Sequence, residues 1–246
     1  MGLKSALNAK MEAITGYRLL SPHHRGANLY SDLRRHLPAT PIRTVLDVGA
    51  NIGQSAQEYL AAFPQATVHS IEPALATYRS LQQRFAGQRR FVAHHLAFSA
   101  QAGAGRLATE GPSETFRLAG VADGSSEPVT LKTLDQFLDE LNIEHTDFMK
   151  IDTEGHDMEV LLGGERSISA ERISIIQVEA GMGPDNDRHI PFEILKSHLE
   201  QFGYRIFGIY DQVPEFPTSS SHLRRTNPVF ISPKVIAANR SRSRPS

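Results

Sequence analysis

Short runs of β-branched and apolar residues alternate along this chain with segments of helical periodicity. The first run, Thr44 to Val48, passes through glycines into a segment in which Ala56, Tyr59, Leu60 and Phe63 recur at helical spacing. Further runs follow at 67–71, 91–98, 147–151, 173–178, 204–210 and 228–231. This alternation is typical of a parallel sheet whose strands are joined by crossover helices. The sequence therefore predicts an α/β fold with helices on both faces of a mostly parallel sheet.

Three segments are predicted within the 246 residues. Residues 41–234 form one α/β domain, a common size for a single core. Residues 1–40 are polar, and the spacing of Tyr30, Leu33 and Leu37 predicts a short helix, so we expect a helical cap. Residues 235–246 are expected to be a disordered basic tail, since they end in Arg, Ser and Pro. The stretch 103–126 lacks periodicity and predicts loops with at most weak hairpin strands.

Bulk composition excludes several classes of function. The net charge of −1 provides no general field for a polyanion, so we expect no nucleic-acid partner. The absence of cysteine excludes disulfides, thiolate metal sites and a cysteine nucleophile. No apolar stretch is long enough to span a bilayer, and we expect a cytoplasmic protein. Composition leaves the oligomeric state open.

A candidate nucleoside site follows the first two strands. Glycine allows close backbone approach and asparagine tolerates positive φ, so the loop after Asp47, made of Gly49, Ala50, Asn51 and Gly53, can form a tight cradle at a helix N-terminus. Glu72 ends the second strand, where a carboxylate can accept hydrogen bonds from both ribose hydroxyls. Asp47 and Asn51 disfavour a pyrophosphate and favour a cation-bearing cofactor.

A second group of polar residues follows the strand at 147–151. The five positions after this buried strand include Asp152, Glu154 and His156, and Glu179 follows the next strand. Carboxylates and an imidazole at such strand ends are candidates for acid–base chemistry. In the alternative, Asp152 or Thr153 caps the next helix, and Glu154 and Asp157 lie favourably in its first turn. The remaining histidines show no ligand spacing, so no metal-binding residue is assigned among them.

Five motifs in order resemble the FkbM family of methyltransferases. They are VLDVGANIGQ at 45–54, SIEP at 70–73, LKTLDQFL at 131–138, FMKIDTEGHDMEVLLGG at 148–164 and IIQVEAG at 175–181. The resemblance covers about Thr44 to Ser232. It implies a class I methyltransferase (Rossmann-like) fold of seven strands with the last antiparallel, and S-adenosylmethionine as methyl donor. It also implies O-methylation of sugars, glycans or secondary metabolites.

The same resemblance adds Phe98 and Ser99 to the cofactor-binding residues. The family commonly carries an acidic residue after this serine, whereas this chain has Ala100. Together with Asp152, the predicted cofactor residues are Asp47, Gly49, Ala50, Asn51, Gly53, Glu72, Phe98 and Ser99.

Methyl transfer to a hydroxyl favours His156 as general base, because its ordinary pKa lies near working pH. Glu154 is the second candidate, and Asp152 and Glu179 would position the acceptor hydroxyl or the cofactor's ammonium group. In an alternative hypothesis, Asp152 and Glu179 bind Mg²⁺, which holds the acceptor oxygen. Two rival functions stay open: a nicotinamide-dependent oxidoreductase and a non-catalytic cofactor-binding subunit.

Overall fold

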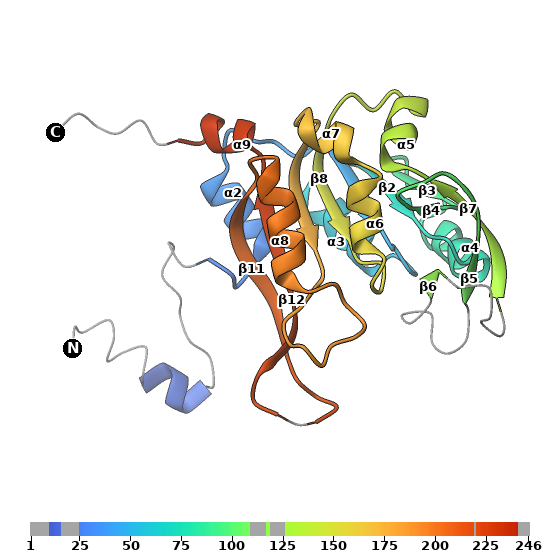
Figure 1. Cartoon of the computed structure of the whole chain (residues 1–246). Coiled ribbons are helices and arrows are strands. Elements are labelled where there is room, and N and C mark those ends of the chain that lie inside the picture. The colour runs from blue at the N-terminus through green and yellow to red at the C-terminus, as the bar shows by residue number, and fades with distance from the viewer. Residues whose placement is uncertain (1–9, 16–24, 109–116, 119–125, 219, 241–246) are drawn as a thin grey trace.

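A large, mostly parallel sheet forms the centre of the molecule (Figure 1). The computed structural model describes residues 10–15, 25–108, 117–118, 126–218 and 220–240. The main sheet has eight strands in the order β10-β12-β9-β8-β1-β2-β3, with β11 paired to β12. Their bounds are β1 Thr44–Val48, β2 Thr67–Ile71, β3 Phe91–His94, β8 Thr146–Ile151, β9 Ile173–Val178, β10 Ala180–Gly181, β11 Arg205–Pro214 and β12 Leu223–Ile231.

The predicted direction of the strands is confirmed. Strands β3, β2, β1, β8 and β9 pair in parallel, and the last strand, β12, is antiparallel to both β9 and β11. The strand count differs slightly from the seven expected. Short β10 follows β9 after the single residue Glu179, and both pair with β12, so β10 extends the line of β9.

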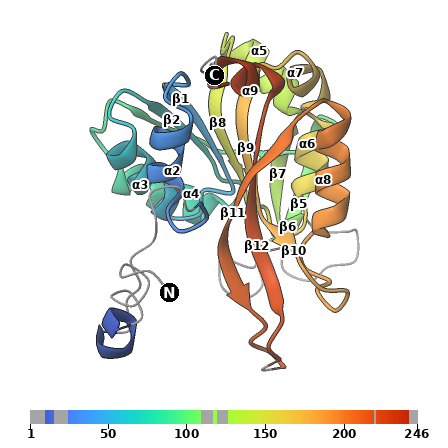
Figure 2. The same cartoon turned by 90° about the vertical axis from the view of Figure 1, so that its left-hand side faces the viewer.

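Helices cover both faces of this sheet, as predicted (Figure 2). Their bounds are α2 Leu29–His36, α3 Gln54–Ala62, α4 Leu75–Arg84, α5 Leu134–Glu140, α6 Asp157–Leu162, α7 Glu165–Ser169, α8 Phe192–Gln201 and α9 Pro233–Ala238. Alternate residues of each central strand enter two cores, one shared with α2, α3 and α9 and the other with α5 to α8. A capping box formed by Thr133 and Gln136 begins α5.

The structure has a second, four-stranded sheet in the region where loops were predicted. The expected strand at 91–98 splits into β3 and β4 (Ala97–Phe98), and β4 pairs with β7 (Ser126–Lys132). Strands β5 (Gly103–Ala108) and β6 (Arg117–Leu118) complete the order β4-β7-β5-β6. Ala97, Leu107 and Val129 of this sheet bury their side chains in one cluster with Ala74, which supplies a core that local periodicity did not indicate.

The two terminal segments contribute helices to the same domain. The predicted helix near Tyr30 is α2, and its Leu29, Leu33 and Leu37 pack in the core with Val45. The expectation of a disordered tail from residue 235 is wrong at its start. Ser232 caps α9, and Val235 is buried against the sheet, because this turn of helix still has an apolar face to bury. Residues 1–9, 16–24 and 241–246 lie outside the described residues.

None of the described helices is both long and apolar enough to cross a membrane.

Candidate active site

A cavity of about 250 Å³ opens at the carboxyl ends of β1, β2 and β8. Its walls are formed by Val48, Gly49, Ala50, Asn51, Gln54, Ser55, Ile71, Glu72, Pro73, Ala97, Phe98, Leu107, Lys150, Asp152, Thr153, Glu154 and His156. The structure thus brings both predicted groups of residues, at 49–51 and at 152–156, to one cavity. Asp47, Gly53, Ser99 and Glu179 lie outside this lining.

The glycine loop has the backbone that its sequence predicts. Asn51 has a φ of 48°, and Gly49 and Gly53 have φ of 82° and 85°. The N–H groups of Gly49 and Ala50 both donate to the Ile71 carbonyl, each at 3.0 Å. A Cβ on Gly53 would lie 2.4 Å from the Phe85 ring, so this glycine serves the packing of α3 against α4. The cradle beside the cavity is therefore formed by Gly49, Ala50 and Asn51.

Glu72 holds this loop in place from the end of β2. Its Oε2 accepts from the Asn51 backbone N–H at 2.9 Å, and its Oε1 accepts from the Ala74 N–H at 2.8 Å. The side chain is buried at the cavity wall. Burial raises the pKa of Glu72 to about 7, against the lowering effect of these two N–H donors. Added hydroxyl donors would stabilise the ionised carboxylate.

A polar row crosses the sheet below the cavity. Strand register places Ser70 and Lys150 on either side of Asp47. The Ser70 hydroxyl donates to Asp47 Oδ2 at 3.2 Å, and Asp47 is fully buried. Burial raises the pKa of Asp47 to about 6, and the nearby Lys150 opposes this rise. Asp47 is therefore a buried carboxylate of the sheet that lies next to the cradle and outside the cavity lining.

Lys150 links this row to the cavity, and our sequence interpretation assigned it no role. Its ammonium donates to Asp152 Oδ2 at 2.8 Å and to Ser55 Oγ at 3.2 Å. Burial alone would raise the pKa of Asp152, but the adjacent Lys150 lowers it. The ammonium thus keeps Asp152 ionised at the cavity wall. A lysine between Met149 and Ile151 in a largely buried strand was the available signal in the sequence.

The turn after Asp152 is shaped by Asp157. Glu154 and Gly155 have φ of 56° and 97°. The Asp157 carboxylate accepts from the N–H of Thr153 at 3.3 Å and of Gly155 at 3.2 Å. Asp157 therefore lies in the first turn of α6, as the alternative expected, whereas the N-cap is His156 and Glu154 precedes the helix.

His156 and Glu154 present side chains to the cavity from this turn. The His156 Nε2 lies 3.4 Å from Ser99 Oγ, which brings predicted Ser99 next to the site. Burial lowers the pKa of His156, so its ring is neutral near pH 7. Glu154 Oε2 accepts from Arg188 Nε at 2.7 Å. Burial raises the pKa of Glu154, which the neighbouring Arg188 opposes.

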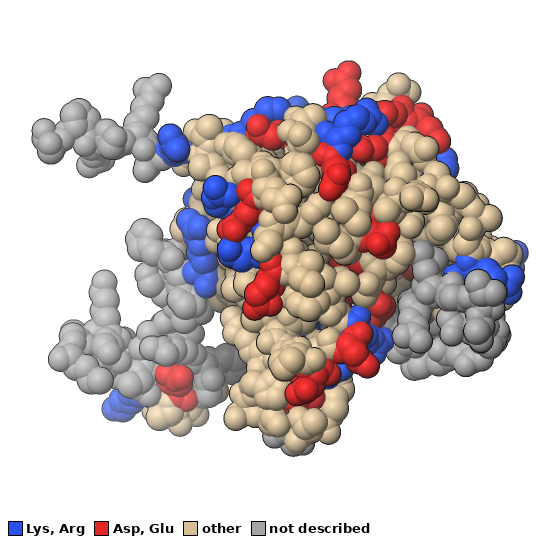
Figure 3. All heavy atoms as spheres, in the orientation of Figure 1, with Lys and Arg blue, Asp and Glu red and all other residues tan. Residues whose placement is uncertain are grey.

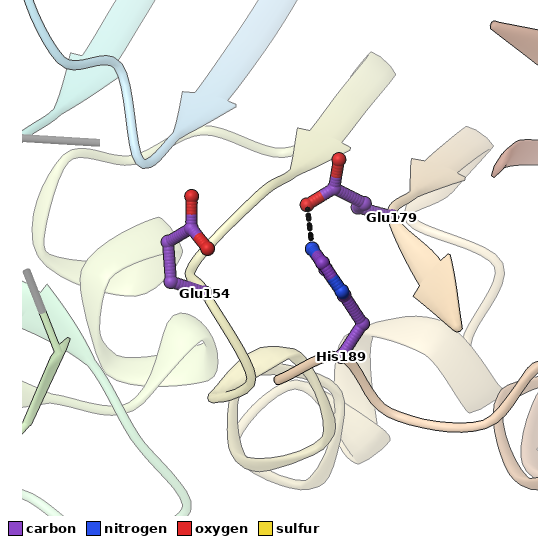
Figure 4. A group of neighbouring side chains, drawn as sticks. All are labelled: Glu154, Glu179 and His189. Carbon is purple, nitrogen blue, oxygen red and sulfur yellow. Dashed lines mark ion pairs between the residues drawn. The ribbon is translucent and has the colours of Figure 1, made fainter. Parts of the chain in front are cut away.

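Glu179 lies beside a histidine that the sequence did not assign. The Nε2 of His189 is 2.9 Å from Glu179 Oε2, and Arg225 donates to Glu179 Oε1. Glu154 approaches the same pair from the neighbouring turn (Figure 4). His189 lies ten residues beyond Glu179 in an irregular segment, so no spacing in the sequence could have linked the two.

Comparison with known proteins places the chain in a family. A family model described as a methyltransferase FkbM domain matches residues 47–206, more than half of the chain. Among curated proteins, no relative matches.

Solved structures of similar architecture include a fibrillarin and a methyltransferase. Fibrillarin from Aeropyrum pernix, solved with S-adenosylmethionine, has 11% identity and a TM-score of 0.44, with 79% of this chain and 69% of that chain covered. Precorrin-6y C5,15-methyltransferase from Geobacter metallireducens has 12% identity and a TM-score of 0.44, with 80% and 84% covered. Both scores lie below 0.5, so neither likeness carries functional weight. The family match extends over the cradle, Glu72 and the turn after Asp152. The chain belongs to the FkbM family of methyltransferases.

Proposed function

We propose that this methyltransferase transfers a methyl group from S-adenosylmethionine to a hydroxyl of a glycan, sugar or secondary metabolite. The observation that carries the proposal is the single cavity that joins the cradle and Glu72 to Asp152, Glu154 and His156. A nucleoside held at the first group would direct its sulfonium end toward the second. S-adenosylmethionine supplies the electrophilic methyl group.

The residues of the cavity fit this cofactor. The Glu72 carboxylate is held by two backbone N–H groups and still has lone pairs for ribose hydroxyls. Asp152 is kept ionised by Lys150 and suits a methionyl ammonium group. Phe98 and Leu107 provide apolar walls for adenine. The acidic residue that Ala100 replaces is not needed for these contacts.

His156 is the proposed general base. A hydroxyl is a poor nucleophile at neutral pH and needs a base within hydrogen-bond reach. His156 lines the cavity, and burial lowers its pKa, so the ring can accept a proton at pH 7. Glu154 is the second candidate, but its carboxylate is bound by Arg188. Glu179 lies deeper and would act on the acceptor through its neighbours.

Replacing His156 with alanine should lower turnover about 100-fold or more while cofactor affinity changes little, because the ring acts on the acceptor. His145→Ala is the control, since His145 stands at the opposite end of β8, hydrogen-bonded to Ser174. Steady-state methyl transfer and cofactor titration would measure both. Equal turnover in the two variants would remove His156 from this role.

Cofactor affinity should rise with pH between about 5.5 and 7, by up to about tenfold per pH unit for one coupled proton. The Glu72 pKa is raised from 4.5 to about 7, so the carboxyl is protonated below 7 and becomes a stronger acceptor for ribose hydroxyls above it. Without cofactor, the effect of Glu72 on folding stability depends on pH in the opposite direction. The folded state binds the Glu72 proton more tightly than the unfolded chain does, so this group's contribution to stability falls as pH rises from 4.5 to about 7.

Calorimetric titration of S-adenosylmethionine across this pH range, on wild type and on Glu72→Gln, would measure the effect. The variant should bind more weakly and with a smaller slope. An identical pH slope in both proteins would show that another group carries it.

The function itself is tested by transfer of a radiolabelled methyl group to cell extracts and to a panel of glycans and small molecules, with mass analysis of the product. A labelled hydroxyl on a glycan or metabolite is the expected result. Methylation on nitrogen or carbon alone would contradict O-methylation. Thermal stabilisation by NAD rather than by S-adenosylmethionine would favour the oxidoreductase, and tight cofactor binding without any labelled product would favour a binding subunit.

We further propose that the acceptor is not a nucleic acid. The net charge is −1, and both basic and acidic side chains occur across the face in Figure 3. A phosphate backbone would favour a surface of one sign. Labelling of extract RNA or DNA in the same assay would contradict this. The expected cytoplasmic location also stays a prediction.

A further inference from the structure

The side chains of Glu154, Glu179 and His189 converge beside the cavity, which Glu154 lines (Figure 4). One ligand atom from each lies within 4.8 Å of the others. The side chains of Glu179 and His189 are each only 5% exposed, and that of Glu154 is 21% exposed. Three residues from three separate turns and loops thus bring two carboxylates and one imidazole close together.

The imidazole of His189 is oriented by Asn186. Asn186 Oδ1 accepts from the backbone N–H groups of Arg188 and His189, both at 3.2 Å, and its Nδ2 donates to the Arg224 carbonyl at 2.8 Å. These contacts identify the oxygen, which lies 2.9 Å from His189 Nδ1. Nδ1 must therefore carry a proton and donate it. Nε2 is left to face the Glu179 carboxylate.

This arrangement is the one that a metal-binding histidine adopts. Such a histidine donates its other ring N–H to an oxygen acceptor, which fixes its tautomer and ring plane. A proton on Nε2 is one way to join His189 to Glu179, and a cation between Nε2 and the carboxylates is the other. Buried carboxylates are stable only when they are paired or when they coordinate a metal.

Each carboxylate of the group is also bound by an arginine. Arg225 binds Oε1 of Glu179, whereas Oε2 faces His189. Arg188 binds Oε2 of Glu154, and a carboxylate has a second oxygen to offer. In these contacts each arginine binds one oxygen of its carboxylate, and the other oxygen is the one that we assign to a cation.

We propose that Glu154, Glu179 and His189 bind one divalent cation with open positions toward the cavity. A set of two oxygens and one imidazole nitrogen suits Mn²⁺ or Zn²⁺ better than Mg²⁺, which prefers oxygen alone. This site replaces the Asp152 and Glu179 pair suggested by the sequence, because Asp152 is bound to Lys150. It rests on the proposed function in one respect: since Glu154 lines the cavity, the cation would hold the acceptor hydroxyl and lower its pKa.

The test is direct binding of Mn²⁺, followed by electron paramagnetic resonance, and of Zn²⁺, followed by calorimetry, on the chelator-treated full chain. We expect one ion per chain. His189→Gln and Glu179→Gln should each weaken binding by about tenfold or more. His198→Gln is the matched control, because His198 is equally buried on α8 and outside the group. Thermal melting would establish that each variant folds, and Glu154→Gln, the most exposed ligand, replaces any variant that does not.

Absence of saturable binding of either ion by the wild type would overturn the cation site, as would equal affinity in wild type and His189→Gln. The result is separable from the proposed function. Methyl transfer that persists in chelator, without bound ion, would reject the cation alone. Ion binding without any binding of S-adenosylmethionine would retain the site and reject the methyltransferase cavity.

Discussion

Replacing Gly49 with alanine should abolish cofactor binding and lower the free energy of unfolding by more than about 3 kcal/mol. The same replacement at Gly87 should cost only about 1 kcal/mol, the usual penalty for a Cβ at positive φ. The two glycines share this backbone strain, with φ of 82° and 81°. They differ in space: a Cβ on Gly49 would lie 1.9 Å from the Asp152 carbonyl oxygen, whereas nothing lies within 4 Å of one on Gly87.

The clash at Gly49 involves backbone on both sides, so no side chain can rotate away. Relief requires β1 and β8 to separate at their carboxyl ends, where Gly49 N–H also bonds to the Ile71 carbonyl at 3.0 Å. That movement displaces the cradle from Asp152 and opens the cavity. Denaturant unfolding and titration with S-adenosylmethionine would measure both effects. Similar losses in the two variants would show that strain alone, and not the contact of the strands, governs this position.

Replacing Lys150 with methionine should destabilise the fold by about 3–5 kcal/mol, the typical cost of leaving a buried charge without its partner. Methionine has a similar length and volume, so the loss is electrostatic. The Lys150 ammonium lies between Asp47, which is fully buried, and Asp152, at 2.8 Å. Without it, both carboxyls would take up protons, and Asp152 would no longer attract a cofactor ammonium.

Lys196→Met is the matched control for this prediction. Lys196 also has a carboxylate partner at 2.7 Å, Glu200, but on the exposed surface of α8, with 38% of its side chain accessible. Such a pair contributes about 0–1 kcal/mol. The measurement is again denaturant unfolding at pH 7, with cofactor affinity followed in parallel. A Lys150→Met protein as stable as the control would mean that Asp47 is already neutral in the wild type.

Local signals in the sequence predicted the backbone conformation and several elements around the site. The positive φ of Asn51 and the helix near Tyr30 depend on a few adjacent residues, and each is present. The positions of Glu72 and Asp152 follow from a general rule, since polar residues at the carboxyl ends of parallel strands meet at one edge. The part of the cavity that we propose for the cofactor could therefore be predicted from residue types and spacing alone.

The deeper part of the site was decided only by the tertiary structure. His189 meets Glu179 because an irregular segment returns over the end of β9, and such a path leaves no periodic trace. Lys150 meets Asp47 through the register of two strands about a hundred residues apart, which depends on the packing of the whole sheet. The second sheet also depends on pairing between distant segments, whose glycines and alanines carry little local preference for strands. The sequence alone thus determined the fold class and the family. The partners of each buried charge came from long-range packing, because a charge is satisfied by what lies near it in space.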